Sequence, residues 1–186
     1  MFELLALTRA IDRVLARIAH ASGWLFLVTS AVICFDVVTR KIGFQLPSMG
    51  STRLQELEWH LAALLFLGWI GYGVVRNAHV RIDVFTAALP QRTKDRIDLI
   101  GGLVFAIPYC LIVLPYAIDF FLVSLGQNEY SDAPTGLPAR YVIKGFLAVG
   151  IFLLLLGAVS FTLRKVVDVF GPPELHSLAP RAETEL

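Results

Sequence analysis

The chain has 186 residues, of which 56% are hydrophobic and 17% charged, and its formal net charge is +1. A soluble domain carries about 25% charged residues, so the composition excludes an ordinary soluble protein, and the near-neutral charge gives no electrostatic basis for binding nucleic acid. The mean hydropathy of +0.70 indicates an integral membrane protein.

The first predicted element is an N-terminal arm, residues 3–20. Apolar residues recur in it at intervals of three and four, namely Leu4, Leu7, Ile11, Val14 and Ile18. A basic stripe on a different face consists of Arg9, Arg13 and Arg17. This pattern predicts an amphipathic helix lying flat on the cytoplasmic surface against phospholipid headgroups, and the alternative is a solvated extension of the first span. The charges interrupt any apolar core, so no cleavable signal peptide is expected.

Four apolar runs follow, each near the length of about 20 residues that a spanning helix needs. They cover roughly residues 21–38, 57–75, 99–123 and 142–163. Backbone groups must be paired with one another in lipid, so the predicted fold class is an all-α integral membrane protein with four transmembrane helices.

The flanking segments complete a single membrane domain over residues 1–170. A short amphipathic segment with Ile82, Phe85 and Leu89 precedes the third span and is expected at the cytoplasmic interface. Pro108 and Pro115 remove backbone donors inside the third span and predict a bent helix. Residues 171–186 are predicted to form a flexible cytoplasmic tail.

The distribution of basic residues predicts the orientation. The arm, the second loop and the tail carry eleven Lys and Arg, against five in the first and third loops and at the start of the fourth span. Cytoplasmic loops carry the excess of Lys and Arg, so both termini are expected in the cytoplasm.

Four charged residues fall within or at the ends of the spans: Asp36, Glu58, Asp119 and Lys144. All four are expected in the outer layer, within about 6 Å of a helix end. Lys144 is expected to balance the acids and contact a neighbouring subunit, unless these side chains snorkel to the interface. The middle of the bilayer receives no charged residue, which argues against an ion path through this chain.

Histidine raises the question of haem. His20 and His60 open successive spans from opposite sides, about 30 Å apart, so they cannot ligate one haem. Cys34 and Cys110 form no metal or redox motif, and no catalytic constellation is visible, so no cofactor and no enzyme activity are expected. Two alternatives stay open here: a membrane-anchor or electron-transfer subunit of a respiratory complex, and a stand-alone small transporter.

Several short runs in and after the second span match one known pattern. They are ELEWHL at 56–61, FLG at 66–68, RNAHVRIDV at 76–84, EYS at 129–131, GLPARY at 136–141 and Ile143-Lys144. In combination they resemble the small membrane subunit of TRAP (tripartite ATP-independent periplasmic) transporters. The resemblance implies sodium-coupled import of organic acids across the bacterial inner membrane. A periplasmic binding protein delivers the substrate, a large multi-helix subunit holds the sodium and substrate sites, and the small subunit serves as a scaffold.

The resemblance also implies candidate partner-binding residues. One group, Glu56, Glu58, Trp59 and His60, is expected at the outer end of the second span, near the docking binding protein. A second group, Arg76, His79, Arg81 and Asp83, is expected at its inner end. Asp119, Arg140 and Lys144 complete the set. Glu56 and Glu58 point about 200° apart on a helix, so one should face the bundle or the large subunit and the other water or the docking partner.

Overall fold

The computed structural model describes residues 1–44, 50–78, 86 and 88–172, and this part of the chain is helical without strands. Its elements are α1 (Phe2–Ile42), α2 (Ser51–Val75), α3 (Gln91–Gly101), the π-helix η1 (Gly102–Ala106), α4 (Ile107–Gly126) and α5 (Tyr141–Phe170). Helices α3, η1 and α4 are continuous, so four helices are long and apolar enough to cross a membrane. The predicted all-α fold with four spanning helices is confirmed.

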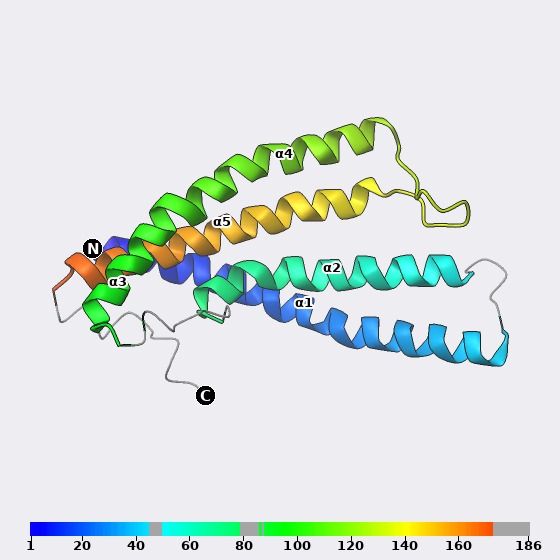
Figure 1. Ribbon diagram of the computed structural model, residues 1–186, viewed down its shortest axis with the longest axis horizontal. Coiled ribbons are helices and arrows are strands. Elements are labelled where there is room, and N and C mark those ends of the chain that lie inside the picture. Colours follow the sequence, from blue (N-terminus) through cyan, green and yellow to red (C-terminus); the bar gives the residue numbers. More distant parts are fainter. Residues whose placement is uncertain (45–49, 79–85, 87, 173–186) are drawn as a thin grey trace.

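The four spans lie side by side in the order α1, α2, α5, α4 (Figure 1). Helix α5 packs against every other helix, whereas α4 packs only on α5 among the described elements, apart from its own continuation η1. Met1, α3 and the end of α5 lie together at what we call the terminal end. The opposite end, with the α1–α2 connection and the 127–140 loop, is the loop end, toward which the α1–α2 and α4–α5 pairs diverge.

The N-terminal arm and the first span, predicted as separate elements, form one continuous helix. Helix α1 has 41 residues and ends at Gly43, which adopts the left-handed conformation (φ 72°). No proline interrupts the sequence before that point, so the helix continues through the polar arm. The arm packs on protein: Leu5 contacts Val167, and Leu15 packs with Val75 and Leu153.

The other helices also extend beyond the predicted spans. Helix α2 begins at Ser51, the third span begins at Gln91 and α5 continues to Phe170. The bend expected from the prolines takes the form of the π-helical turn before Pro108, and the helix curves along its length (Figure 1). Pro108 cannot donate to Val104, and its ring crowds that carbonyl; the wider π turn accommodates both.

Helices α2 and α5 approach closely through two glycines. A Cβ on Gly71 would overlap the backbone carbonyl of Leu153, and a Cβ on Gly157 would overlap the carbonyl of Gly71. Small residues permit such backbone contact between membrane helices. The two contacting glycines therefore set the separation of the central helices. Helix α2 stays helical through its three glycines, Gly68, Gly71 and Gly73.

Candidate functional site

The loop end is organised around Glu56. Its carboxylate accepts hydrogen bonds from the Ser131 hydroxyl and from the Leu137 backbone N–H, the latter at 2.6 Å. One turn earlier, Arg53 donates to the carbonyl of Thr135 at 3.2 Å. Helix α2 thus holds the 127–140 loop, and both hydrogen-bond partners of Glu56 belong to that loop.

Two bases of the loop end, Lys144 and Arg140, pair with acids of the 127–140 loop. Lys144 binds Glu129 and lies 3.9 Å above the Phe120 ring, and Arg140 binds Asp132 at 2.6 Å. The hydrogen bond from Lys144 lowers the pKa of Glu129, and the hydrogen bond to Asp132 raises the pKa of Arg140. The expectation that Lys144 balances the acids of the spans is wrong. Its partner is Glu129, a loop residue just after α4, which lies beside the first turn of α5.

Asp36 has its partner within its own helix. It forms an ion pair with Arg40 one turn later, and Ser51 lies at 3.5 Å from its other oxygen. The side chain is 1% exposed. Asp36 was expected at the end of the first helix, but α1 continues to Ile42, so this carboxylate is buried rather than snorkelled.

Glu58, Trp59 and His60 differ in their surroundings. One carboxylate oxygen of Glu58 is enclosed with no hydrogen-bond partner in the described part of the chain. Trp59 is 76% exposed, and the Nδ1 of His60 lies 2.5 Å from the carbonyl of Glu56. The structure therefore gives Glu56 an intrachain role and leaves Trp59 available to a partner.

Asp119 lies on the exposed side of α4. It is seven residues before Gly126, the last residue of the helix, which places it about 10 Å from that end. The expected depth of about 6 Å is too shallow because α4 extends past the predicted end at residue 123. No hydrogen bond or ion pair to Asp119 is found within the described residues.

The terminal end contains two ion-pair clusters that the sequence did not reveal. Lys165 lies 2.6 Å from Asp95, 3.4 Å from Asp98 and 3.9 Å from Asp168. Both Asp95 and Asp98 come from α3, so the cluster fixes α3 on α5. The sequence contains a signal for this cluster, since Asp95 and Asp98 directly precede the third predicted span and Lys165 directly follows the fourth, on the side expected to be cytoplasmic for both.

The second cluster joins three helices. Arg164 lies 3.5 Å from Asp12 and donates to the carbonyl of Val75 at 3.1 Å, and Ser160 donates to Asp12 at 2.6 Å. Helix α5 is thereby tied to the arm of α1 and to the end of α2. Asp12 is one of several charged residues in the sequence of the arm, and nothing in that sequence marks Ser160 and Arg164 of α5 as its partners.

The second predicted group lies mostly outside the described residues. Arg76 follows the last residue of α2 at the terminal end. His79, Arg81 and Asp83 lie outside the described residues, as do Ile82 and Phe85 of the second amphipathic segment and the tail from residue 173 onward. Leu89 is described and lies in the turn before α3.

The fold and these clusters define a multi-pass helical membrane protein in which ion pairs join helices at the terminal end and brace the loop at the other. Comparison with family models matches residues 29–168 to the DctQ component of tripartite ATP-independent periplasmic transporters. The match covers about three quarters of the chain. The chain belongs to this family: it is the small membrane component of a bacterial TRAP transporter, a transport subunit and not an enzyme. Searches among curated proteins and among solved structures each gave no match.

Proposed function

We propose that the chain is the static membrane support of a sodium-coupled importer of organic acids. In this arrangement a periplasmic binding protein delivers the substrate and a large membrane subunit moves it. The family is ATP-independent by definition, so accumulation requires an ion gradient. The family match supports assembly of this chain with a large membrane subunit and a binding protein. The distribution of charges along the helices supports a static role for this chain and a transporting role for the large subunit.

One observation supports the proposal that this chain is a static support. Each spanning helix has a central stretch without Asp, Glu, Lys or Arg: residues 21–35, 61–75, 99–118 and 145–163. Transport sites lie near the bilayer midplane and use polar groups or broken helices there. Helices α2 and α5 pack without a break through this layer, backbone to backbone at Gly71 and Gly157. This chain is suited to hold a moving partner in place.

The uneven distribution of Lys and Arg gives the orientation of the chain in the membrane. The terminal end, with the larger share of Lys and Arg, faces the cytoplasm, and the loop end faces the periplasm. Trp59 and the 127–140 loop then lie on the side from which the binding protein docks. Cysteines replacing Glu3 or Pro180 in a chain without Cys34 and Cys110 should be shielded from impermeant thiol reagents in intact cells. A cysteine replacing Asp132 should react, and the reverse pattern would contradict the orientation.

Reconstitution tests the division of labour. Liposomes with the large subunit and this chain, supplied with the binding protein and labelled substrate, should take up substrate when an inward sodium gradient is imposed. Liposomes with this chain alone should show none, with or without the binding protein. Sodium-driven uptake by this chain alone would contradict the support role, and uptake by the complete system without sodium would contradict the coupling.

A further inference from the structure

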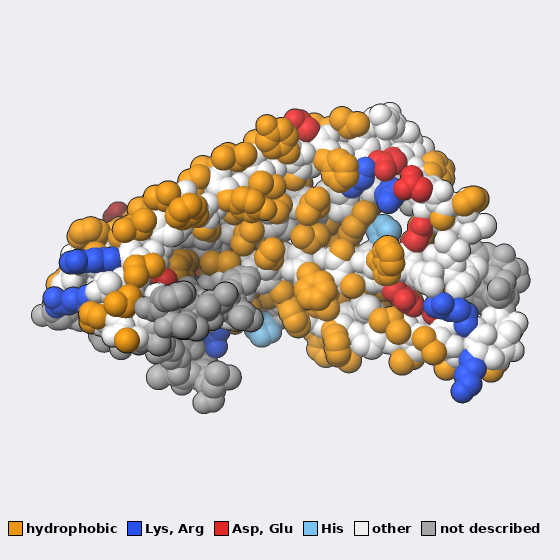
Figure 2. Space-filling view, viewed as in Figure 1, with side chains coloured by type: hydrophobic (Ala, Val, Ile, Leu, Met, Phe, Trp, Pro, Cys, Tyr) orange, Lys and Arg blue, Asp and Glu red, His pale blue; other side chains and the backbone are white. Residues whose placement is uncertain are grey.

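One side of α4 has no neighbour in the described chain. Cys110, Ala117 and Ser124, seven residues apart, are the buried residues of this helix, and α4 packs only on α5 apart from η1. Figure 2 shows hydrophobic side chains along the edge that α4 forms for most of its length. The face away from α5 is therefore open to lipid or to another protein.

The open face carries a regular stripe, which we call the α4 seam. It consists of Tyr109, Ile112, Tyr116, Asp119 and Val123. The spacing of three and four residues is the one that aligns side chains along a helix and packs into a second helix at a shallow crossing angle. Its apolar members are large and well exposed, with Tyr116 at 71% and Ile112 at 62%. Aromatic residues of this kind provide contact area at protein interfaces.

Asp119 distinguishes the α4 seam from a surface that contacts only lipid. A carboxylate exposed to the hydrocarbon is unfavourable, and acids in spanning segments usually pair with a base or line a protein contact. The bases nearest this layer are already engaged: Arg40 by Asp36, Arg140 by Asp132 and Lys144 by Glu129. Asp119 points about 200° away from Ala117, which faces α5. Lys41 and Arg53 belong to α1 and α2, which do not contact α4. Within the described residues no base is placed to pair with Asp119, so we look for its cation on another molecule.

A second copy of this chain is a poor source of that cation. In a two-fold dimer with its axis along the membrane normal, the two α4 seams would meet in parallel. Asp119 would then lie beside its own counterpart, and two carboxylates in one site disfavour each other. Charge complementarity thus favours a different chain.

We propose that the α4 seam is the surface on which a transmembrane helix of the large subunit packs. That helix carries a Lys, Arg or His at the depth of Asp119. The inference rests on the proposed function and deepens it by assigning the docking face and the chemistry of the residue opposite. The α1 side, which bears Trp24, faces lipid.

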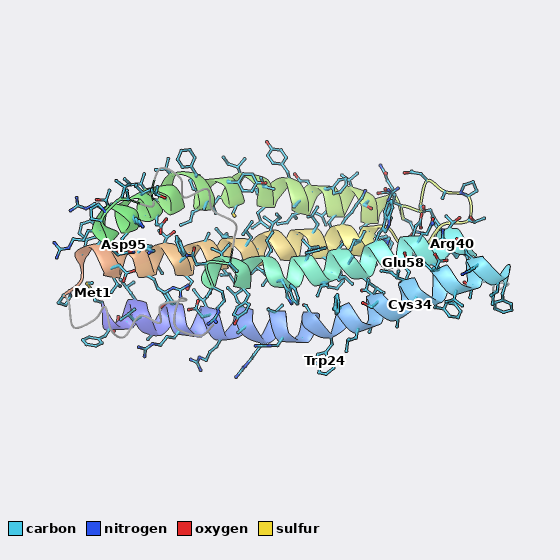
Figure 3. The ribbon with its side chains drawn as sticks, turned by 60° about the horizontal axis from the view of Figure 1, so that its bottom comes forward. Met1, Trp24, Cys34, Arg40, Glu58 and Asp95 are labelled. Atoms are coloured by element: carbon cyan, nitrogen blue, oxygen red, sulfur yellow. The ribbon has the colours of Figure 1, made fainter. Side chains whose placement is uncertain are left out.

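Site-directed photocross-linking tests the face. A benzophenone amino acid is placed at Tyr116 or at Trp24, which are 71% and 72% exposed and so equally accessible; Trp24 points away from the bundle (Figure 3). The tagged chain is expressed in its native host and irradiated in membranes. Position 116 should cross-link to the large subunit and position 24 should not. A cross-link from 116 to a second copy, or equal cross-linking from both positions, would overturn the assignment.

Two further outcomes separate this inference from the proposed function. If the large subunit co-purifies with the chain but position 116 cross-links to no protein, the seam is wrong and the proposed function stands. If the unmodified tagged chain does not retain the large subunit at all, both fail.

The charge is tested on the same complex. Asp119→Asn should lower the amount of large subunit retained in mild detergent by about tenfold or more, and Asp119→Glu should restore most of it. Asp132→Asn, which removes an acid paired within the chain, should change retention by less than about twofold. Asp119 has no partner within the described chain, so Asp119→Asn should leave the melting temperature of the isolated chain unchanged. A lowered melting temperature, or normal retention, would overturn the proposal.

Discussion

Helices α4 and α5 are both apolar, yet α5 buries eight residues and α4 only three. Helix α5 buries small and hydroxylated residues such as Gly150, Gly157, Ala158 and Ser160, and it contacts every other helix. Helix α4 buries only a narrow stripe and exposes large aliphatic and aromatic side chains. Lipid is as apolar as leucine, so hydrophobicity alone does not bury a side chain in a membrane protein. Small and polar residues mark the faces that contact protein within this chain.

The largest expected effect comes from the glycine contact in the centre of the bundle. Gly157→Leu should prevent α2 and α5 from approaching, because no backbone shift short of separating the helices makes room for the side chain. We expect destabilisation by about 3 kcal/mol or more and poor recovery of folded protein. Gly101 has open space around it, so Gly101→Ala is the matched control, with a change within about 1 kcal/mol. The measurement is the thermal unfolding midpoint in detergent, and equal midpoints would show that the contact is not limiting.

A smaller effect is expected from the cluster that attaches the arm to α5. Arg164→Gln leaves Asp12 without its base at a site where the two side chains are 12% and 19% exposed. The expected cost is about 1–3 kcal/mol, with faster proteolysis of the arm. Arg17 is an exposed base on the same helix as Asp12, and Arg17→Gln should be nearly neutral. Equal stability of the two variants would show that the arm is held by its apolar contacts alone.

The two acids at the start of α2 should separate clearly on mutation. Glu56→Gln weakens the hydrogen bonds to Ser131 and Leu137 and should cost about 1 kcal/mol. It should also speed hydrogen exchange of the Leu137 backbone N–H, which donates to Glu56. Glu58 has an enclosed oxygen without a partner in the described residues, so Glu58→Gln should be neutral or slightly stabilising in the isolated chain. If only Glu58→Gln loosens the loop, the assignment of these roles is reversed.

The smallest effect concerns acidification of the loop end. The pKa of Glu129 is lowered by Lys144, so the stability from this pair is present above the ordinary glutamate pKa, about 4.3. It is lost only as the pH falls through the lower folded value. The melting temperature of the chain in detergent should therefore stay level through that pH and fall below it. In Lys144→Gln the melting temperature should be lower near neutral pH and this acid-dependent fall should be smaller, because the stability from the pair is absent at every pH. A profile equal to that of the unchanged chain would show that Lys144 does not govern the loop.

The sequence predicted the number of spans and the family, because apolar length and a few motifs carry that information. It did not predict helix lengths: apolar runs report the hydrocarbon layer, whereas α1 ends at Gly43, α3 begins after Pro90 and α5 ends before Gly171-Pro172. These terminators were readable as helix signals in their own right.

The ion pairs were harder to predict than the helices. Lys144 and Glu129 lie fifteen residues apart in sequence, and several other acids of the spans were equally plausible partners for this base. Likewise, Asp12 meets Ser160 across 148 residues, and only the packing of α1 along α5 brings them together. Pairing of this kind depends on helix rotation, which the composition of a span does not determine.

The π-helical turn has a consequence for register. Buried positions follow steps of seven residues from Asp95 to Gly102 and again through Cys110, Ala117 and Ser124, but the step from Gly102 to Cys110 is eight. The turn therefore absorbs one extra residue and keeps both halves of the helix in phase with α5. Deleting a single residue between 102 and 106 would leave each half intact but rotate one against the other by about 100°. Either Asp95 would then leave Lys165, or Ala117 would turn away from α5.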